Sequence, residues 1–391
     1  MKRVLTIIAL LAAGTAAHAQ YYYQDSKNPE MLRHAERHEP CRKEVVLPAQ
    51  VNGFNVYKAD LHSHTIYSDG QVLPIFRVKE AWQDGLDIIA ITDHLESRKH
   101  EEQLYEYLKG YTDKKYLPKT EGVKSGLLDL NFSVKQAIPE AEKVGILVIP
   151  GTEISRSGAT VGHFNALFTK DNNTIHDDDA LQAMRNARSQ GALIQHNHPG
   201  WRRENLNMTE VEKAAYEEGL IDGVEVMNGN EFYPGIIDRV HERGLYLASN
   251  TDIHFATANE YRLTGTMRNM TLVFAEEMTL DSVKDALVND RAIAFGFNTL
   301  CGSEELLRAF FLASVRLTPI PGQNGACRLT NLTSIPYVLQ RGKGNYFRLD
   351  PFSSISISLS KNATDIPLTV INAWVSKDKR LSVKVPANSE N

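Results

Sequence analysis

The stretch that most constrains this chain is residues 60–64, which read Asp-Leu-His-Ser-His and are followed by Asp69. It comes directly after residues 54–57, an alternating segment that predicts a β-strand. Side chains two residues apart on a strand point to the same face, so His62 and His64 would present two imidazoles side by side. Such a pair suits one divalent metal ion. A single H-x-H pair is also typical of packed core histidines, so this interpretation depends on the rest of the chain.

Predicted strands and helices alternate over residues 51–313. Strands are expected at 54–57, 86–91, 146–149, 163–168, 192–194, 223–227, 245–248 and 270–274, and helices at 72–84, 134–144, 180–190, 209–218, 236–243 and 280–289. This alternation predicts a parallel sheet, closed as a barrel or open and doubly wound. The polar stretch 96–124 is too long for a simple connection and is predicted to form a lid or rim over a site.

Most of the histidines, and several carboxylates, lie at the ends of these predicted strands. They are His62, His64, His94, His163, His196, His198 and His254, with Asp69, Asp93, Glu153 and Asp252. Polar groups at the ends of several strands are the placement expected of an active site on a βα barrel. Unpaired buried ionisable groups cost several kcal/mol each in folding free energy. Divalent cations bound by these groups would offset that cost. The pattern therefore predicts a multinuclear metal site, although singly Asp93 could cap a turn and His163 could be a core residue.

Composition excludes some classes of protein. A net charge of -5 over 391 residues argues against a general nucleic-acid or membrane-surface binder. The three cysteines are too scattered for a zinc–thiolate site, and a Cys301–Cys327 bridge stays open. No G-x-S-x-G motif of a nucleophilic serine hydrolase is present.

The two ends of the chain differ from its centre. Residues 1–19 are predicted to be a cleavable signal peptide, because Lys2 and Arg3 precede an apolar run that ends before Ala17-His18-Ala19. That run is shorter than the roughly 20 residues of a membrane span, so we expect a secreted or periplasmic protein. Residues 20–50 are expected to form an N-terminal extension. Residues 314–391 show short alternating runs, which predict a small β-rich module for packing or homo-oligomerisation.

The motifs together resemble the polymerase-and-histidinol-phosphatase (PHP) family. The resemblance rests on His62-Ser63-His64 with Asp69, Thr92-Asp93-His94, Gly151-Thr152-Glu153, Gly162-His163, His198-Pro199 and Thr251-Asp252-Ile253-His254, in the family's order. It implies an α/β fold with a distorted (β/α)7 PHP barrel. The resemblance does not reach residues 314–391, whose alternating runs predict a small C-terminal β-sandwich-like domain. It also implies a centre with three metal positions, which would hold two or three divalent ions of zinc, manganese or iron.

The resemblance also implies roles for single residues. By position, His62, His64 and Asp252 would hold one ion, Glu153 would bridge to a second held by His163 and His198, and Asp69, His94 and His254 would hold a third. Asp69 stands where many members have His. Either His196 or His198 could be the ligand. Pro199 favours His198, and His196 would then either support the ligands from behind or assist the leaving group.

The implied activity is that of a secreted metal-dependent phosphoesterase acting on a small organic phosphoester. A metal-bridging hydroxide would attack phosphorus, since metal ions lower the pKa of water to about 7. Diesters are favoured over monoesters. Arg98, Lys99, Arg202 and Arg203 could clamp the phosphate, with Arg98 and Arg202 as catalytic candidates, and Trp201 could stack on a leaving group. The alternatives are a phosphomonoesterase of histidinol-phosphatase type, a non-catalytic metal-binding or interaction protein, and, less favoured, a hydrolase of carbon–nitrogen bonds.

Overall fold

The computed structural model describes residues 22–34, 41–110, 127–262, 267–360 and 363–387 and divides into two units, Met1–Arg42 and Lys43–Asn391. In the first unit, strands β1 (Tyr22–Gln24) and β2 (Leu32–His34) pair antiparallel. The predicted signal peptide lies outside the described residues. Among the residues that are described, no helix has the length and apolar character needed to cross a membrane.

The second unit is organised around one large mixed sheet. Its central strands are ordered β12–β4–β5–β6–β7–β8–β9–β11. They span β4 (Phe54–Asp60), β5 (Ile88–Ile91), β6 (Leu147–Ser155), β7 (His163–Leu167), β8 (Leu193–Asn197), β9 (Gly223–Asn228), β11 (Tyr246–Asn250) and β12 (Met270–Ala275). Thr271 Oγ1 donates to the carbonyl of Ser249 at 3.1 Å and accepts from the N–H of Ser249 at 3.0 Å. These two hydrogen bonds join β11 and β12, the strands at the two ends of this order.

The predicted parallel direction is wrong for two of these strands. β4, β5 and β6 run parallel, as do β8, β9 and β11, but β7 is antiparallel to both of its neighbours and β12 is antiparallel to β4. No helix separates β6 from β7, and a short connection of this kind joins antiparallel strands. The reversal places His163, the first residue of β7, opposite Ser155 and Asn197, the last residues of β6 and β8.

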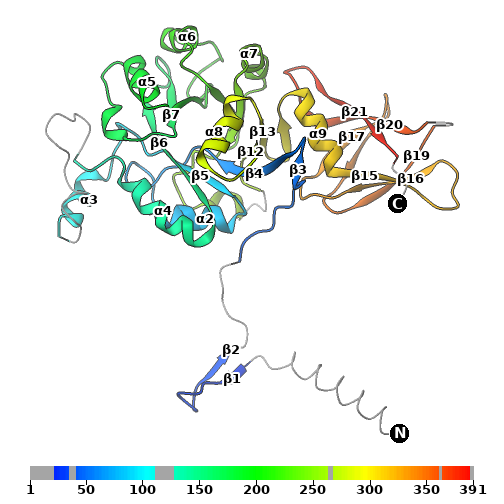
Figure 1. Ribbon diagram of the computed structural model, residues 1–391, viewed down its shortest axis with the longest axis horizontal. Coiled ribbons are helices and arrows are strands. Elements are labelled where there is room, and N and C mark those ends of the chain that lie inside the picture. The colour runs from blue at the N-terminus through cyan, green and yellow to red at the C-terminus, as the bar shows by residue number, and fades with distance from the viewer. Residues whose placement is uncertain (1–21, 35–40, 111–126, 263–266, 361–362, 388–391) are drawn as a thin grey trace. The chain divides into compact units, whose positions relative to one another are not determined.

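The predicted helices are all present and lie along the outside of the strands (Figure 1). They are α2 (Pro74–Gln83), α4 (Phe132–Val144), α5 (Ala180–Ser189), α6 (Glu210–Glu217), α7 (Ile237–Glu242) and α8 (Leu280–Val288). Gly145 ends α4 in the left-handed conformation. Thr209 and Glu212 form the predicted capping box of α6. The predicted lid stretch, 96–124, contains α3 (Glu101–Leu108), and its part from residue 111 onward lies outside the described residues.

Short elements complete the sheet and its connections. They are β3 (Gln50–Val51), β10 (Glu231–Phe232), β13 (Ala292–Gly296), β14 (Thr299–Cys301), the 3₁₀ turns η2 (Asn172–Thr174) and η3 (Pro234–Ile236), and the π-helical turn η4 (Ala258–Arg262). β13 and β14 continue the large sheet beyond β12.

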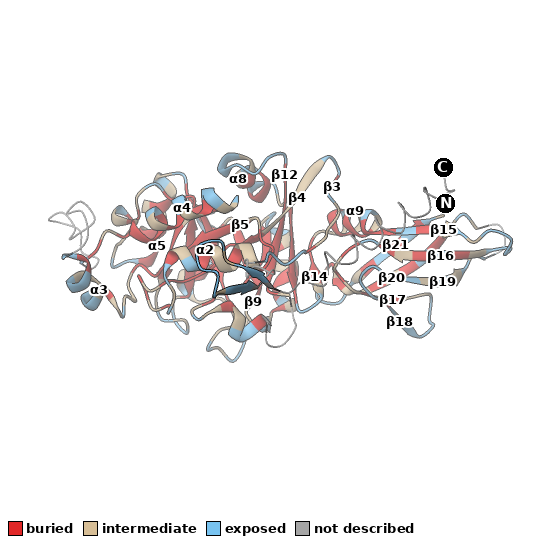
Figure 2. Cartoon of the chain, turned by 90° about the horizontal axis from the view of Figure 1, so that it is seen from below, coloured by how far each residue is buried: buried red, intermediate tan, exposed pale blue. Residues whose placement is uncertain are grey.

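The C-terminal residues form strands in two sheets, preceded by α9 (Glu304–Ser314), which was not predicted. β15 (Val315–Pro319), β16 (Ala326–Asn331) and β19 (Ser354–Ser358) form a separate sheet. β17 (Tyr337–Gln340), β18 (Tyr346–Leu349), β20 (Asp365–Trp374) and β21 (Arg380–Pro386) extend the large sheet, because β20 pairs with β14. Buried residues alternate along β16, β20 and β21, so one face of each strand points into a core (Figure 2).

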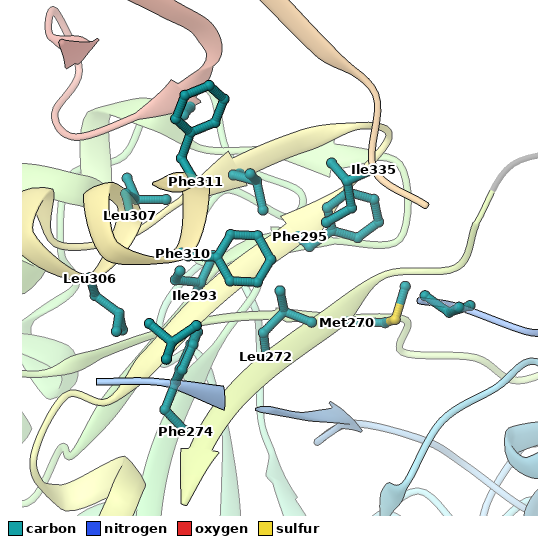
Figure 3. Packing of buried hydrophobic residues seen from close by; sticks show 14 of the residues in the cluster. Met270, Leu272, Phe274, Ile293, Phe295, Leu306, Leu307, Phe310, Phe311 and Ile335 are labelled. Carbon is teal, nitrogen blue, oxygen red and sulfur yellow. The ribbon is translucent and has the colours of Figure 1, made fainter. Parts of the chain in front are cut away.

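Helix α9 joins this core to that of the central strands. Phe310 of α9 packs among residues of β12 and β13 (Figure 3). Leu307, Phe311 and Ile335 belong to the same cluster. Phe311 also meets the ring of Tyr337 at 4.9 Å. Each such buried side chain contributes about 1.5–3 kcal/mol. The central and C-terminal strands thus share one hydrophobic cluster.

The disulfide that the sequence left open is not formed. Cys301 and Cys327 are both buried free thiols, and they belong to different hydrophobic clusters. Burial raises the pKa of both thiols, which keeps them protonated.

Candidate metal centre

All nine predicted metal ligands meet at one rim of the central sheet. They form four overlapping groups, and within each group the candidate ligand atoms lie within 4.8 Å of one another: His64, Asp69, His94 and His254; His62, His64 and Glu153; His62, His198 and Asp252; and Glu153, His163 and His198. The side chains come from the ends of β4, β5, β6, β8 and β11 and from the start of β7. The reversal of β7 is what brings His163 to this rim.

Three of these ligand atoms come together beside the two histidines that follow β4. The Nε2 atoms of His62 and His64 lie 3.0 Å apart, and Asp252 Oδ1 lies 3.1 Å and 3.0 Å from them. Ligands that bind one ion at about 2.0–2.2 Å are themselves separated by about 3 Å. The three atoms are therefore spaced as ligands of one divalent ion.

Glu153 lies in the middle of the cluster and is fully buried. Its Oε1 lies 3.2 Å from His163 Nδ1 and 3.5 Å from His198 Nε2. Its Oε2 lies 3.5 Å from His64 Nε2. One carboxylate thus faces ligands of two groups, as a bridging ligand would.

Asp69 belongs to the group that also contains His64, His94 and His254. Asp69 Oδ1 lies 3.3 Å from His94 Nε2 and 3.1 Å from His254 Nε2. The ring of His64 stacks on the rings of His94 and His254 at 4.3 Å in each case. Asp69 is therefore placed to act as a ligand, as the sequence predicted.

Hydrogen bonds outside the cluster orient three of the imidazoles. His62 Nδ1 lies 2.9 Å from Glu225 Oε1, His163 Nε2 lies 2.6 Å from the carbonyl of Arg156, and His254 Nδ1 lies 2.7 Å from the carbonyl of Asp252. Each oxygen accepts the ring N–H, so the other nitrogen presents its lone pair to the cluster. This is the arrangement expected of metal-binding histidines.

The electrostatics of the cluster fit divalent cations. Asp69 Oδ1 and Glu153 Oε2 are buried and accept no hydrogen bond from the residues that the structure describes. Burial and the neighbouring His94 and His254 lower the pKa of His64 to about 4. Burial opposes protonation of His94, but Glu153 and Asp69 outweigh it and raise its pKa to about 10. Bare carboxylate oxygens and crowded imidazoles are the donor set that transition-metal ions take.

The backbone is left-handed at two of the ligands. The φ angle is 51° at Asp252 and 24° at His198. Such conformations are costly for residues other than glycine and are concentrated at functional sites.

Asp93 has a structural role instead. Its carboxylate accepts from the N–H and the hydroxyl of Thr65 and from the hydroxyl of Ser68, each at 2.7 Å. It belongs to none of the four ligand groups. Asp93 therefore fastens the loop that follows His64, which differs from the predicted alternative of capping the turn after Asp93.

The structure does not bring His196 to the cluster. Its Nε2 lies 2.9 Å from Glu212 Oε1 and its Nδ1 lies 3.0 Å from the hydroxyl of Tyr216. Neighbouring residues on a strand face opposite sides, and the side chain of Asn197 is the one that reaches Glu153, at 3.0 Å. The geometry thus favours His198 as the ligand and gives no support to His196 in leaving-group chemistry.

Two of the predicted phosphate-clamping arginines are engaged elsewhere. Arg98 pairs with Glu101 at 2.9 Å, and its side chain is only 5% exposed. Arg203 forms two hydrogen bonds with the buried carboxylate of Glu212, at 2.9 Å and 2.6 Å. Both serve as buried ion pairs, so the predicted catalytic role of Arg98 finds no support in its position.

A cleft of about 510 Å³ opens beside the ligands. It is lined by Asp69, His94, Ser97, Lys99, Ser155, Arg156, Ser157, Gly158, Ala159, His163, Trp201 and Arg202. The guanidinium of Arg202 lies 4.3 Å from the centre of the Trp201 ring. That ring lies 5.2 Å from the imidazole of His163 and 5.4 Å from that of His198. Trp201 therefore connects the metal ligands to a cation on the cleft wall.

Sequence reasoning missed Glu225 and Arg156. Glu225 is fully buried beneath His62, and Arg156 lines the cleft while pairing with Glu96. Neither residue belongs to a recognisable motif. The one available signal was that Glu225 interrupts an apolar predicted strand, where an unpaired charge is costly.

Comparisons with known proteins agree with this geometry. Residues 60–232 match the PHP domain family. Among solved structures, the chain is similar to a two-domain protein from Bacteroides vulgatus ATCC 8482 that contains a predicted PHP-like metal-dependent phosphoesterase. The identity is 31%, the TM-score is 0.77, and the match covers 90% of this chain and 99% of that chain.

Two further structures are less similar. A proposed metal-dependent phosphoesterase from Bifidobacterium adolescentis ATCC 15703 matches at 15% identity and a TM-score of 0.38, covering 62% of this chain and 98% of that chain. A lesion-specific endonuclease from Pyrococcus furiosus matches at 17% identity and a TM-score of 0.36, covering 67% of this chain and 61% of that chain. No curated protein matches the chain.

Proposed function

The chain belongs to the PHP family of metal-dependent phosphoesterases, and we propose that it hydrolyses small organic phosphodiesters at a trinuclear metal centre. The observation that carries this proposal is the meeting of all nine predicted ligands at one rim, next to a cleft lined by cationic side chains. We further propose that the central strands form the family's distorted (β/α)7 barrel, over residues 51–313, and that residues 314–391 form its sandwich-like partner domain.

The donor atoms divide into three ion sites. His62, His64 and Asp252 would hold the first ion and His163 and His198 the second, with Glu153 shared between them. Asp69, His94 and His254 would hold the third. When bound, zinc, manganese or iron ions would lower the pKa of a water molecule toward about 7 and offset the charge of the phosphoester.

The chain's own side chains bind and orient the substrate. Lys99 and Arg202 line the cleft, and Lys99 Nζ lies 3.3 Å from Asp69 Oδ2, beside the third ion site. Charged donors of this kind bind phosphate oxygens. Arg202 is the second cation of the clamp, and the Trp201 ring, 4.3 Å from its guanidinium, offers a stacking surface for an aromatic or otherwise flat alcohol group.

A second hollow favours diesters over monoesters. It has a volume of about 370 Å³ and shares Ala159 and Arg202 with the cleft; Asn205, Asn207 and Thr209 are among its other lining residues. A phosphodiester carries two alcohol groups, and the two adjoining hollows offer one space for each. A phosphomonoester would leave one of them empty.

Two model substrates test this proposal. The purified protein, loaded separately with Mn²⁺, Zn²⁺ or Fe²⁺, is assayed with bis-p-nitrophenyl phosphate and with p-nitrophenyl phosphate, and His62→Ala serves as the control. We expect the bis ester to be the better substrate and the variant to be inactive. A preference for the monoester would support the phosphatase alternative. Turnover of neither ester would support the non-catalytic alternative.

We also propose that the protein is exported and that its mature form begins after residue 19. The support is the signal-peptide pattern of the first residues. Mass spectrometry of the protein from a periplasmic fraction should find Gln20 at the N-terminus. A cytoplasmic protein that keeps residues 1–19 would contradict export. We also propose homo-oligomerisation through the C-terminal module, and light scattering of the full chain tests it: a monomeric mass would contradict the proposal.

A further inference from the structure

A carboxylate that belongs to none of the four ligand groups lies directly behind the metal centre. Glu225 lies in β9, and its side chain is fully buried. Among the described residues, its ion-pair partner is His62 alone. Burying a carboxylate costs several kcal/mol unless hydrogen bonds and a nearby positive charge offset it, so its place in the fold calls for an explanation.

Donors from several strands converge on this carboxylate. Glu225 Oε1 faces His62 Nδ1 at 2.9 Å and accepts from Asn250 Nδ2 at 2.9 Å and from Gln195 Nε2 at 3.4 Å. Glu225 Oε2 accepts from Asn228 Nδ2 at 2.7 Å and from the His198 N–H at 2.8 Å. The donors Gln195 and Asn250 are themselves fully buried. The site is therefore built to hold an ionised, acceptor-only group in one orientation.

The contact with His62 fixes which of its nitrogens faces the cluster. Glu225 Oε1 can only accept, so the ring proton lies on Nδ1, and Nε2 presents a lone pair toward His64 and Asp252. In the other tautomer an N–H would point into the ion site. Glu225 thereby selects the form of His62 that can bind a metal ion.

The contact with His198 acts through the backbone. His198 has a φ of 24°, which few non-glycine residues adopt, and its N–H donates to Glu225 Oε2. This hydrogen bond helps to hold the strained backbone that places the His198 ring near Glu153 and Asp252. The same carboxylate therefore supports one ligand of the first ion site and one of the second.

We propose that Glu225 is a positioning residue of the metal centre, which sets the tautomer of His62 and the backbone of His198 and so raises the affinity of both ion sites. This inference rests on the proposed function only in requiring that the centre binds divalent ions. Substitution of Glu225 should act first on metal affinity, and on turnover only as a consequence of the lower metal affinity.

Glu225→Gln tests the proposal because it keeps the shape of the side chain. A glutamine carries an NH₂ group in place of one acceptor oxygen, so it must face a donor at either His62 or His198 and lose that contact. The matched control is Asp222→Asn, three residues earlier. The Asp222 carboxylate accepts from the Ile194 N–H at 2.7 Å and pairs with Arg188 at 2.6 Å, and Asp222 belongs to no ligand group.

Zinc and manganese contents per chain are measured by elemental analysis, and affinities by competition with a chromogenic chelator. Mutation of a residue that hydrogen-bonds a metal-bound histidine typically lowers metal affinity by 10–100-fold. We expect Glu225→Gln to lower the affinity of at least one site by about that factor, and Asp222→Asn to bind as the wild type does. Wild-type affinity in Glu225→Gln would overturn the inference. Absence of metal from the wild type would overturn the proposed centre itself.

A measurement on the wild-type protein covers the case in which the variant does not fold. In the ¹⁵N-histidine NMR spectrum of the zinc-loaded protein, we expect His62 to carry its proton on Nδ1 and to bind zinc through Nε2. Assignment of the zinc to Nδ1 of His62 would overturn the proposal.

Discussion

The Nε2 atoms of His62 and His64 face each other at 3.0 Å, and Oδ1 of Asp252 lies within 3.1 Å of both. Glu225 holds the ring proton of His62 on the far nitrogen, so the near nitrogen is a lone-pair donor. Three donor atoms that crowd together in this way are stabilised by a cation between them. The predictions on metal binding depend on this arrangement.

His64→Ala should remove more metal than His163→Ala. His64 belongs to two of the four ligand groups, whereas His163 belongs to one. We expect the His64 variant to lose at least one ion per chain and to hydrolyse bis-p-nitrophenyl phosphate more than about 100-fold more slowly, since even residues that only support ligands change activity by 10–100-fold. Elemental analysis and initial rates measure this. An equal metal content in the two variants would contradict the grouping.

Metal ions should raise the stability of the fold in addition to supporting the reaction. A ligand that binds only the native state adds about 2.7 kcal/mol at a concentration 100 times its Kd. Removal of metal by a chelator should therefore lower the Tm by roughly 5 °C or more, given a few degrees per kcal/mol for a domain of this size. Scanning calorimetry with EDTA and after return of Mn²⁺ checks this. His62→Ala should show a smaller difference between the two conditions.

Much of this centre could be predicted from the sequence because its ligands follow strands. The apolar runs before His94, Glu153 and His198 predict buried strands, and polar residues at their ends meet at one rim. The direction of β7 could not be predicted in this way. His163 opens its strand instead of ending it, and its place at the rim follows only from antiparallel pairing.

The misassigned residues show where sequence reasoning stops. Arg203 was a candidate because it flanks a strand end, and His196 because it is paired with His198 in sequence, but both contact the buried carboxylate of Glu212. The capping box predicted for Glu212 was confirmed, yet nothing in its spacing reveals the second set of partners. Long-range ion pairs of this kind depend on tertiary packing, as does the contact between Glu225 and His62.

Arg202→Met should weaken substrate binding without removing metal. Arg202 lines both hollows and stacks on Trp201 at 4.3 Å. Loss of a charged phosphate contact should raise KM for the bis ester by about 10-fold, or about 1.4 kcal/mol. Arg202→Lys should restore little of the lost substrate affinity, because lysine lacks the planar group that stacks on Trp201. Arg243→Met is the matched control, since Arg243 lies 5.4 Å from the Tyr216 ring outside the cleft lining.

Arg203→Met should destabilise the fold strongly. It would leave the fully buried Glu212 carboxylate without its guanidinium and would break the 2.7 Å hydrogen bond from Arg203 to the carbonyl of Gly158. Removing one partner of a buried pair typically costs 3–5 kcal/mol. The double variant Arg203→Met/Glu212→Gln should be less destabilised than the sum of the two single variants. Urea unfolding of the four proteins measures the coupling, and simple additivity would contradict it.

The pH dependence of stability should carry a signature of Asp290. This residue follows α8 with a φ of 50°, and burial raises its pKa to about 7, against about 3.9 in an unfolded chain. Between these two values the native state binds the extra proton, so this group lowers the free energy of unfolding as the pH rises from about 4 to about 7.

Asp290→Asn keeps a side chain that tolerates the left-handed backbone and cannot ionise. It should therefore stabilise the protein at pH 8 by about 1–2 kcal/mol, an amount reduced for the partial exposure of the carboxylate, and change little at pH 4. Urea unfolding in EDTA at both pH values tests this, and an equal effect at the two would show that burial of the charge is not the cause.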